Sequence, residues 1–213
     1  VYRKADPSDI VVTAAGGLVG EVAQIWKPKQ INTFETDWGF SCMGYEISGA
    51  LGIKMAKPDQ EVIVFVGDGS YLLQNSDIYS SILYEKKLII VICDNSGHMV
   101  INRLQLAKGG KEYLCNLKTS RATNFIEVDF AAHAASMGAE TETVTSTSEL
   151  ESAFLRAKKS NKTYVIALKT HGYEWLEGTA FWESPTLEVS SSEKNKKAYQ
   201  EHKEGKEKQR KGV

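Results

Sequence analysis

Two apolar runs, joined by a stretch of helical character, constrain the fold of this chain more than any other feature. Residues 62–66 are Val-Ile-Val-Phe-Val and residues 88–93 are Leu-Ile-Ile-Val-Ile-Cys. Neither run alternates with polar residues, which is typical of strands covered on both faces. We therefore expect two adjacent, buried parallel strands.

Polar turns follow both runs directly. Gly67-Asp68-Gly69-Ser70 ends the first run, and Asp94-Asn95-Ser96-Gly97 ends the second. The carboxyl ends of parallel neighbours lie side by side, where open α/β sheets bind ligands. The Asp68 carboxylate, the Asn95 amide oxygen and a backbone carbonyl would then suit Mg²⁺, which usually keeps part of its coordination shell for phosphate oxygens.

A diphosphate is the expected partner of such an ion. Gly67 and Gly69 let the backbone approach an anion closely, and the helix that follows offers unpaired N–H groups. Gly-Asp-Gly alone is more often an ordinary strand-to-helix turn. The asparagine, one helix and one strand later, favours a cofactor site because this spacing resembles the thiamine diphosphate motif.

Strand and helix patterns alternate through the chain, which predicts an α/β fold with a doubly wound, mostly parallel sheet and helices on both faces. Further strands are expected at residues 10–13, 32–35, 141–145 and 164–169. Helices are expected at residues 16–26, 44–55, 75–85, 99–105, 129–137 and 148–160. Residues 107–123 form a long polar loop of the kind that often acts as a lid. We expect residues 1–187 to form one cofactor-binding domain, followed by a charged helix or tail at residues 188–213.

Bulk properties exclude several classes of protein. A net charge of −1 argues against non-specific nucleic-acid binding, and no apolar run reaches the length of a membrane span. The three cysteines have no metal-ligand spacing and indicate reduced thiols in the cytoplasm. A strand is expected almost directly after Val1, so we expect this chain to be a piece of a longer protein.

Several runs resemble the thiamine diphosphate-binding domain of the acetohydroxyacid synthase and pyruvate decarboxylase superfamily. Within it they are most similar to the trihydroxycyclohexanedione hydrolases of myo-inositol catabolism. The resemblance extends from about Asp9 to Val189 and implies a thiamine diphosphate-binding fold, with thiamine diphosphate and Mg²⁺ as cofactors. Besides the two turns, the runs are Trp38-Gly39-Phe40-Ser41-Cys42-Met43-Gly44-Tyr45-Glu46-Ile47, Ile101-Asn102-Arg103-Leu104-Gln105 and His171-Gly172-Tyr173-Glu174.

The resemblance also implies roles for individual residues. The Asp68 and Asn95 side chains, with the Gly97 carbonyl, would bind Mg²⁺. The Ser41 carbonyl would accept a hydrogen bond from the cofactor's pyrimidine amino group. Met43 would be the apolar wedge that holds the two cofactor rings in a V shape. The other implied cofactor contacts are Ala15, Gly16, Gly17, Leu18, Cys42, Gly67, Gly69, Ser70, His98 and Met99.

The first diphosphate loop departs from the synthase pattern, in which Gln and His follow the glycine. Gly17 and Leu18 stand there in this chain, so only backbone donors can act. Weaker candidates for substrate contacts are Asn102, Arg103 and Gln105. We expect His171 and Glu174 to lie in a segment that packs on the body of the domain.

The implied reaction is carbon–carbon cleavage that opens a cyclic 1,2-dione (trihydroxycyclohexanedione) in inositol degradation. In the superfamily a glutamate on a separate pyrimidine-binding domain activates the cofactor, which lies in a cleft between domains. We therefore expect the activating glutamate to lie on a domain outside this chain and the other catalytic residues to be unknown. We also expect no turnover by this chain alone, a partner domain from the same enzyme, and a homodimer or tetramer.

Three alternatives remain. One is the subunit of a split 2-oxoacid decarboxylase of the sulfopyruvate or phosphonopyruvate type. Another is a 2-oxoacid:ferredoxin oxidoreductase β subunit, which the dispersed cysteines disfavour. The last is a non-catalytic nucleotide-binding module, which is weakened because residues 14–20 lack Gly-x-Gly-x-x-Gly spacing.

Overall fold

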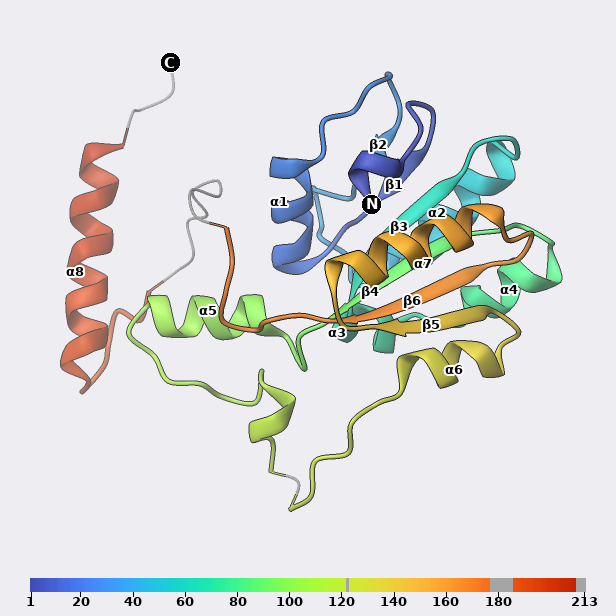
Figure 1. Cartoon of the computed structure of the whole chain (residues 1–213). Coiled ribbons are helices and arrows are strands. Elements are labelled where there is room, and N and C mark those ends of the chain that lie inside the picture. Colours follow the sequence, from blue (N-terminus) through green and yellow to red (C-terminus); the bar gives the residue numbers. More distant parts are fainter. Residues whose placement is uncertain (122, 177–185, 210–213) are drawn as a thin grey trace.

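All six strands of the described residues run parallel in one sheet, in the order β2-β1-β3-β4-β6-β5 (Figure 1). The computed structural model describes residues 1–121, 123–176 and 186–209. The predicted α/β fold is thereby confirmed. The strands are β1 (Ile10–Val12), β2 (Phe34–Glu35), β3 (Val62–Gly67), β4 (Ile89–Asp94), β5 (Glu140–Val144) and β6 (Tyr164–Lys169).

The helices follow the predicted order, with one addition. The helix expected at residues 75–85 is shorter than predicted, and a separate helix begins at Asp68, directly after β3. The loop expected at residues 107–123 contains a 3-10 turn at Leu117–Thr119. The α-helices are α1 (Gly16–Ile25), α2 (Tyr45–Ala56), α3 (Asp68–Leu73), α4 (Asp77–Leu83), α5 (Met99–Ala107), α6 (Phe130–Ser136), α7 (Thr147–Lys159) and α8 (Glu193–Lys208), and a 3-10 turn at Tyr2–Lys4 precedes β1.

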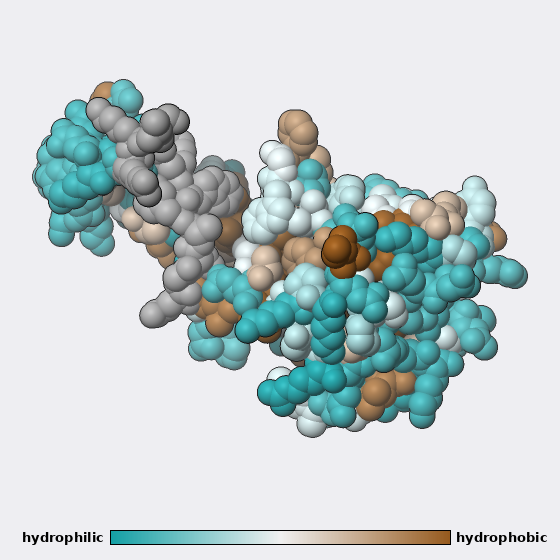
Figure 2. Space-filling view, turned by 90° about the horizontal axis from the view of Figure 1, so that it is seen from above, coloured by the Kyte–Doolittle hydropathy of each residue, from teal (hydrophilic) through white to brown (hydrophobic). Residues whose placement is uncertain are grey.

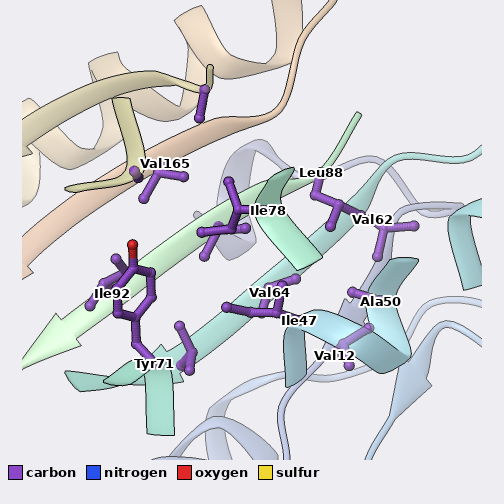
Figure 3. Close-up of a cluster of buried hydrophobic side chains, with 14 of the residues drawn as sticks. Val12, Ile47, Ala50, Val62, Val64, Tyr71, Ile78, Leu88, Ile92 and Val165 are labelled. Carbon is purple, nitrogen blue, oxygen red and sulfur yellow. The ribbon is translucent and has the colours of Figure 1, made fainter. Parts of the chain in front are cut away.

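Side chains of the central strands alternate between two apolar cores, one on each face of the sheet. On one face α2, α3, α4 and α6 cover the sheet, and Figure 3 shows Ile47, Tyr71 and Ile78 packed over β3 and β4. On the other face Trp26 and Phe154, from the end of α1 and from α7, pack against the opposite sides of the same strands. Because both faces are covered, β3 and β4 carry the continuous apolar runs seen in the sequence.

Helix α8 lies beside the end of α5, away from the sheet (Figure 1). The backbone of Gly109 approaches that of Lys194 so closely that a Cβ on the glycine would lie 2.7 Å from the Lys194 carbonyl oxygen. Figure 2 shows this end of the molecule as predominantly hydrophilic. No helix in the described ranges combines the length and the apolar character needed to cross a membrane.

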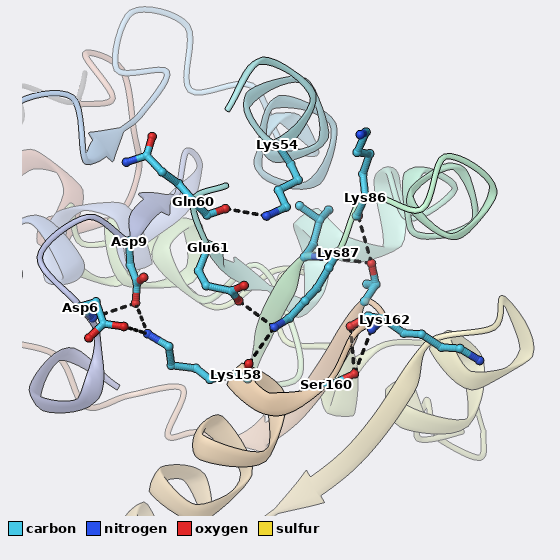
Figure 4. A network of polar contacts seen from close by, with 12 residues as sticks. Asp6, Asp9, Lys54, Gln60, Glu61, Lys86, Lys87, Lys158, Ser160 and Lys162 are labelled. Atoms are coloured by element: carbon cyan, nitrogen blue, oxygen red, sulfur yellow. Dashed lines mark hydrogen bonds and ion pairs between the residues drawn. The ribbon is translucent and has the colours of Figure 1, made fainter. Parts of the chain in front are cut away.

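The amino ends of the strands, called here the amino edge, are held by ion pairs (Figure 4). Lys158 Nζ lies 2.6 Å from Asp6 Oδ2 and 2.7 Å from Asp9 Oδ2. Lys87 Nζ lies 2.9 Å from Glu61 Oε2 and donates to the Lys158 carbonyl oxygen at 3.1 Å. These contacts join the residues that precede β1, β3, β4 and β6.

The opposite edge, called here the carboxyl edge, contains the topological switch point. The chain passes from β1 to β2 on one side and then returns to place β3 on the other side of β1. The loops after β1, β3 and β4 therefore emerge side by side at this edge. This is the position at which open parallel sheets bind ligands.

Candidate functional site

Three loops at the carboxyl edge carry most of the residues predicted from sequence. They follow β1 (residues 13–15), β3 (which ends at Gly67) and β4 (residues 95–98). A fourth segment, residues 39–44, leads into α2. The two side chains predicted to bind the metal, those of Asp68 and Asn95, stand at adjacent strand ends because β3 and β4 pair in register, with Gly67 opposite Cys93.

Three polar groups converge between the ends of β3 and β4. One polar atom of the Asn95 amide lies 3.2 Å from Asp68 Oδ1 and 2.8 Å from the Gly97 carbonyl oxygen. With nitrogen at this position the amide donates two hydrogen bonds. With oxygen there, three oxygens face one another, which is a ligand set suited to a hard divalent cation.

Asp68 is placed at an electrostatic cost. It is 2% exposed, and burial together with the nearby Asp94 raises the pKa of its carboxyl from 3.8 to about 6, against backbone hydrogen bonds from Gly97, Asn95 and Gly69. Asp94 itself pairs with Lys169, which also contacts Glu127. A cation beside Asp68 would relieve the cost because it favours the ionised carboxylate.

The loop after β4 is fixed by a segment that is distant in sequence. The N–H of His98 donates to the Cys115 carbonyl at 2.8 Å, and the N–H of Leu117 donates to the Ser96 carbonyl at 2.9 Å. Gly97 has φ +155°, and a Cβ there would lie 2.1 Å from the Cys115 carbonyl oxygen. Only glycine fits this position, and Ser96 beside it adopts φ +63°, a rare conformation for a non-glycine residue that is often found at functional sites.

His98, Gly69 and Met43 meet above the turn that follows β3. A Cβ on Gly69 would lie 2.7 Å from the His98 ring and 3.5 Å from Met43 Cε. By contrast, a Cβ on Gly67 would meet no atom within 4 Å. The backbone at Gly67 is therefore open to a group that approaches from outside the protein.

The loop after β1 lies beside α5. A Cβ on Gly17 would lie 3.6 Å from the Val100 side chain, and Gly16 adopts φ +78°. The Ala15 N–H donates to Glu46 Oε1 at 3.1 Å. The Ala15 N–H is therefore engaged within the protein, and the donors that remain for an anion belong to Gly16, Gly17 and Leu18 in the first turn of α1.

The predicted pyrimidine-contacting segment is largely exposed. Ser41 adopts φ +51°, and Met43 is 39% exposed. The Cys42 N–H donates to Asp37 Oδ2 at 3.2 Å, and the hydrogen bond between its thiol and Asp37 raises the thiol pKa. Met43, the predicted wedge, and its neighbours thus lie at the surface, where a ligand or another domain can reach them.

The remaining candidates, for cofactor and for substrate contacts, lie around α5. Met99 is buried, and a Cβ on Gly172 would lie 2.8 Å from its Cε, so this predicted cofactor contact is covered by the segment after β6. Arg103 stacks on the Trp175 ring, 4.4 Å from its centroid. The His171 and Glu174 side chains are exposed. The segment that contains them packs on α5, as expected.

Sequence reasoning did not identify Glu46, which is fully buried and hydrogen-bonds to both Ala15 and Ser70. A signal was present, because Glu46, Ala50 and Lys54 are four residues apart and share one stripe of α2. All three are buried.

The comparisons with known proteins identify the family and the fold of this domain. Residues 14–168 match the family described as "Thiamine pyrophosphate enzyme, C-terminal TPP binding domain". A solved Rhodococcus jostii RHA1 thiamine diphosphate-dependent 4-hydroxybenzoylformate decarboxylase has a similar fold, with a TM-score of 0.69 at 18% identity, over 80% of this chain and 31% of that one.

Curated relatives are similar over nearly the whole chain. Proteins named 3D-(3,5/4)-trihydroxycyclohexane-1,2-dione hydrolase are 38% identical over 206 residues in Halalkalibacterium halodurans and 41% identical over 197 residues in Listeria monocytogenes. The matches cover 94% and 92% of this chain but only 32% and 31% of those relatives, so the chain spans about a third of their length. The chain belongs to the thiamine pyrophosphate enzyme family, as its C-terminal, cofactor-binding domain.

Proposed function

We propose that the carboxyl edge binds thiamine diphosphate through Mg²⁺. The observation that carries this proposal is the convergence of Asp68, Asn95 and the Gly97 carbonyl, because a carboxylate, an amide oxygen and a carbonyl are hard ligands. Coordination would require the Asn95 oxygen to face the ion. The Asp68 carboxylate would supply the negative charge that attracts Mg²⁺.

The diphosphate is proposed to lie between the first turns of α1 and α3. The N–H groups of Gly16, Gly17 and Leu18, which lie in the first turn of α1, would donate from one side, and those in the first turn of α3 would donate from the other. The open backbone at Gly67 supports this position, since nothing occupies the space that a side chain would fill.

The rings are proposed to rest on Met43, with the Ser41 carbonyl as acceptor for the pyrimidine amino group and with Cys42 and His98 nearby. When bound, thiamine diphosphate would supply the chemistry of a nucleophilic carbon toward a substrate carbonyl. This chain's contribution is to bind and orient the cofactor and to hold the metal.

The proposed activity of the whole enzyme is hydrolytic ring opening of a trihydroxycyclohexane-1,2-dione in inositol catabolism, based on the names of the relatives. The activating glutamate would come from the pyrimidine-binding domain, in a homodimer or tetramer. Trp38, Phe40 and Met43 support this, since they are 59%, 87% and 39% exposed beside the site. We assign the enzyme to the cytoplasm because Cys42, Cys93 and Cys115 are free thiols.

Calorimetric titration of thiamine diphosphate, with and without Mg²⁺, tests the site. We expect binding that requires Mg²⁺ in the wild-type chain and is lost in Asp68→Ala, while Asp59→Ala, which removes an exposed aspartate, binds normally. Binding that is independent of Mg²⁺ would favour a nucleotide-binding module. If neither this chain nor the full-length enzyme binds, the proposal is wrong.

A further inference from the structure

The N-termini of three helices converge on one buried carboxylate, that of Glu46. Ala15 is the N-cap of α1, Gly44 is the N-cap of α2, and Ser70 lies in the first turn of α3. Glu46 is 0% exposed and occupies the first turn of α2. No role for this residue follows from the family description or from the proposed metal and cofactor contacts.

Glu46 makes hydrogen bonds to all three helix starts. Its Oε1 accepts from the Ala15 N–H at 3.1 Å, and its Oε2 accepts from the Gly44 N–H at 2.9 Å. The Ser70 hydroxyl lies 3.0 Å from Oε1 and 2.8 Å from Oε2. The Gly44 N–H also donates to the Ser70 hydroxyl oxygen at 2.7 Å, which closes the network.

This network needs a carboxylate. The donors are two backbone N–H groups and one hydroxyl, and all of them are neutral. A buried carboxylate is costly without a cation, but three helix N-termini provide partial positive charge around it. An amide could not replace it fully, because one of its two polar atoms is a donor and would face a donor.

The three segments that Glu46 joins are the ones proposed to contact the cofactor. Ala15 begins the first diphosphate-binding turn, Ser70 belongs to the second, and Gly44 directly follows the wedge residue Met43. Their mutual distances therefore depend on one side chain that does not itself reach the ligand. Only glycine fits at position 44 in this arrangement, because its φ is +96° and a Cβ there would lie 2.3 Å from Gln74 Cβ.

We propose that Glu46 is a positioning residue that fixes the two diphosphate-binding turns and the wedge before the cofactor arrives. The inference rests on the proposed function and extends it to the preorganisation of the site. Removing a group that orients the ligands of a metal typically weakens metal affinity or activity by about 10–100-fold. We expect an effect of this size on thiamine diphosphate binding in the presence of Mg²⁺.

The experiment compares Glu46→Gln with Asp9→Asn in the 213-residue chain. Asp9 is a matched control because it is also a buried carboxylate, 4% exposed, but lies at the amino edge. Calorimetry gives the Kd for thiamine diphosphate with Mg²⁺, thermal unfolding gives the Tm, and hydrogen exchange without cofactor reports the Ala15 and Gly44 amides. We expect Glu46→Gln to raise the Kd about 10–100-fold and to accelerate exchange at both amides. We expect Asp9→Asn to lower the Tm without either change.

A second variant separates the hydroxyl from the carboxylate. Ser70→Ala keeps the backbone N–H that is proposed to face the diphosphate, so its effect on the Kd should arise through Glu46. The double variant should then bind no more weakly than Glu46→Gln alone.

The outcomes distinguish the two proposals. If wild type binds and Glu46→Gln raises the Kd no more than the control Asp9→Asn does, the positioning role is wrong while the proposed function stands. If wild type does not bind in this chain or in the full-length enzyme, the proposed function fails. In that case unchanged amide exchange in Glu46→Gln would also overturn the role of Glu46 in holding the turns.

Discussion

At the amino edge of the sheet Asp9 and Glu61 each face a lysine, whereas at the carboxyl edge Asp68 faces a second aspartate. The first arrangement satisfies its buried charges within the chain. The second leaves a carboxyl whose pKa is raised to about 6 and that a cation would stabilise. The comparison teaches that the charges at the amino edge stabilise the fold. At the carboxyl edge the ionised Asp68 carboxylate is unfavourable until a bound cation neutralises it.

Breaking an ion pair at the amino edge should have the largest effect on stability. Lys158→Met removes the partner of Asp9, whose side chain is 3% exposed. An unpaired buried carboxylate costs about 3–5 kcal/mol. We expect a loss of that order in the free energy of unfolding, measured by urea denaturation. Cofactor affinity should stay unchanged under native conditions. A stability loss no larger than that for the exposed pair of Lys4 and Glu151 would contradict the comparison of the two edges.

Gly97→Ala tests whether the carboxyl edge depends on backbone geometry. The new Cβ would collide with the Cys115 carbonyl oxygen at 2.1 Å, so the loop after β4 must move away from residues 115–117. We expect a loss of about 2–3 kcal/mol in unfolding free energy, together with loss of Mg²⁺-dependent cofactor binding. Gly20→Ala is the control, because a Cβ there meets no atom within 4 Å.

Asp68→Asn should have the opposite sign and stabilise the protein without ligands. The folded pKa of about 6 exceeds the ordinary value of 3.8, so Asp68 stays protonated to a higher pH in the folded state than in the unfolded state. Wild-type stability therefore falls as pH rises from about 4 to about 6, and this contribution is constant above that window. We expect the variant to be more stable at pH 7.5 by about 1–3 kcal/mol.

Chemical denaturation at several pH values measures this gain, which should disappear near pH 3.5 if Asp68 is its origin. Added Mg²⁺ with thiamine diphosphate should stabilise wild type but not Asp68→Asn. An equal gain in the exposed control Asp59→Asn would show that net charge, rather than the site, is responsible.

The smallest effect is expected for an exposed ion pair near the amino edge. Lys4 and Glu151 lie 3.2 Å apart, with side chains 41% and 46% exposed. Lys4→Ala should change the unfolding free energy by less than about 0.5 kcal/mol. A loss as large as that of Lys158→Met would mean that the amino edge does not owe its strength to buried pairs.

The parts of the fold that could be predicted depend on local sequence pattern. Continuous apolar runs indicated β3 and β4, and β6 was predicted at residues 164–169, where the structure has it. The bounds of α3 (Asp68–Leu73) were not predicted, because a helix of 6 residues is too short to show a helical apolar period.

The site could be predicted only where residue type and spacing reveal it. Asp68 and Asn95 were identified from neighbouring strand ends, and the structure brings them together, although their role in binding Mg²⁺ stays a prediction. The engagement of Ala15 by Glu46, and the contact of Gly97 with Cys115, join residues that are distant in sequence. Such contacts depend on tertiary packing, which pattern analysis of one sequence does not contain.

The strand order also determines when the site can form during folding. Ile10 in β1 pairs with Val62 in β3, so the first and second of the three loops meet only after the intervening β2 and α2 segment has been closed. Long-range pairing of this kind is slow, because loop closure is unfavourable until the later contacts form. The third loop is held by residues 115–117, farther still along the chain. A ligand that binds at the carboxyl edge can therefore stabilise the completed fold, but it cannot nucleate folding.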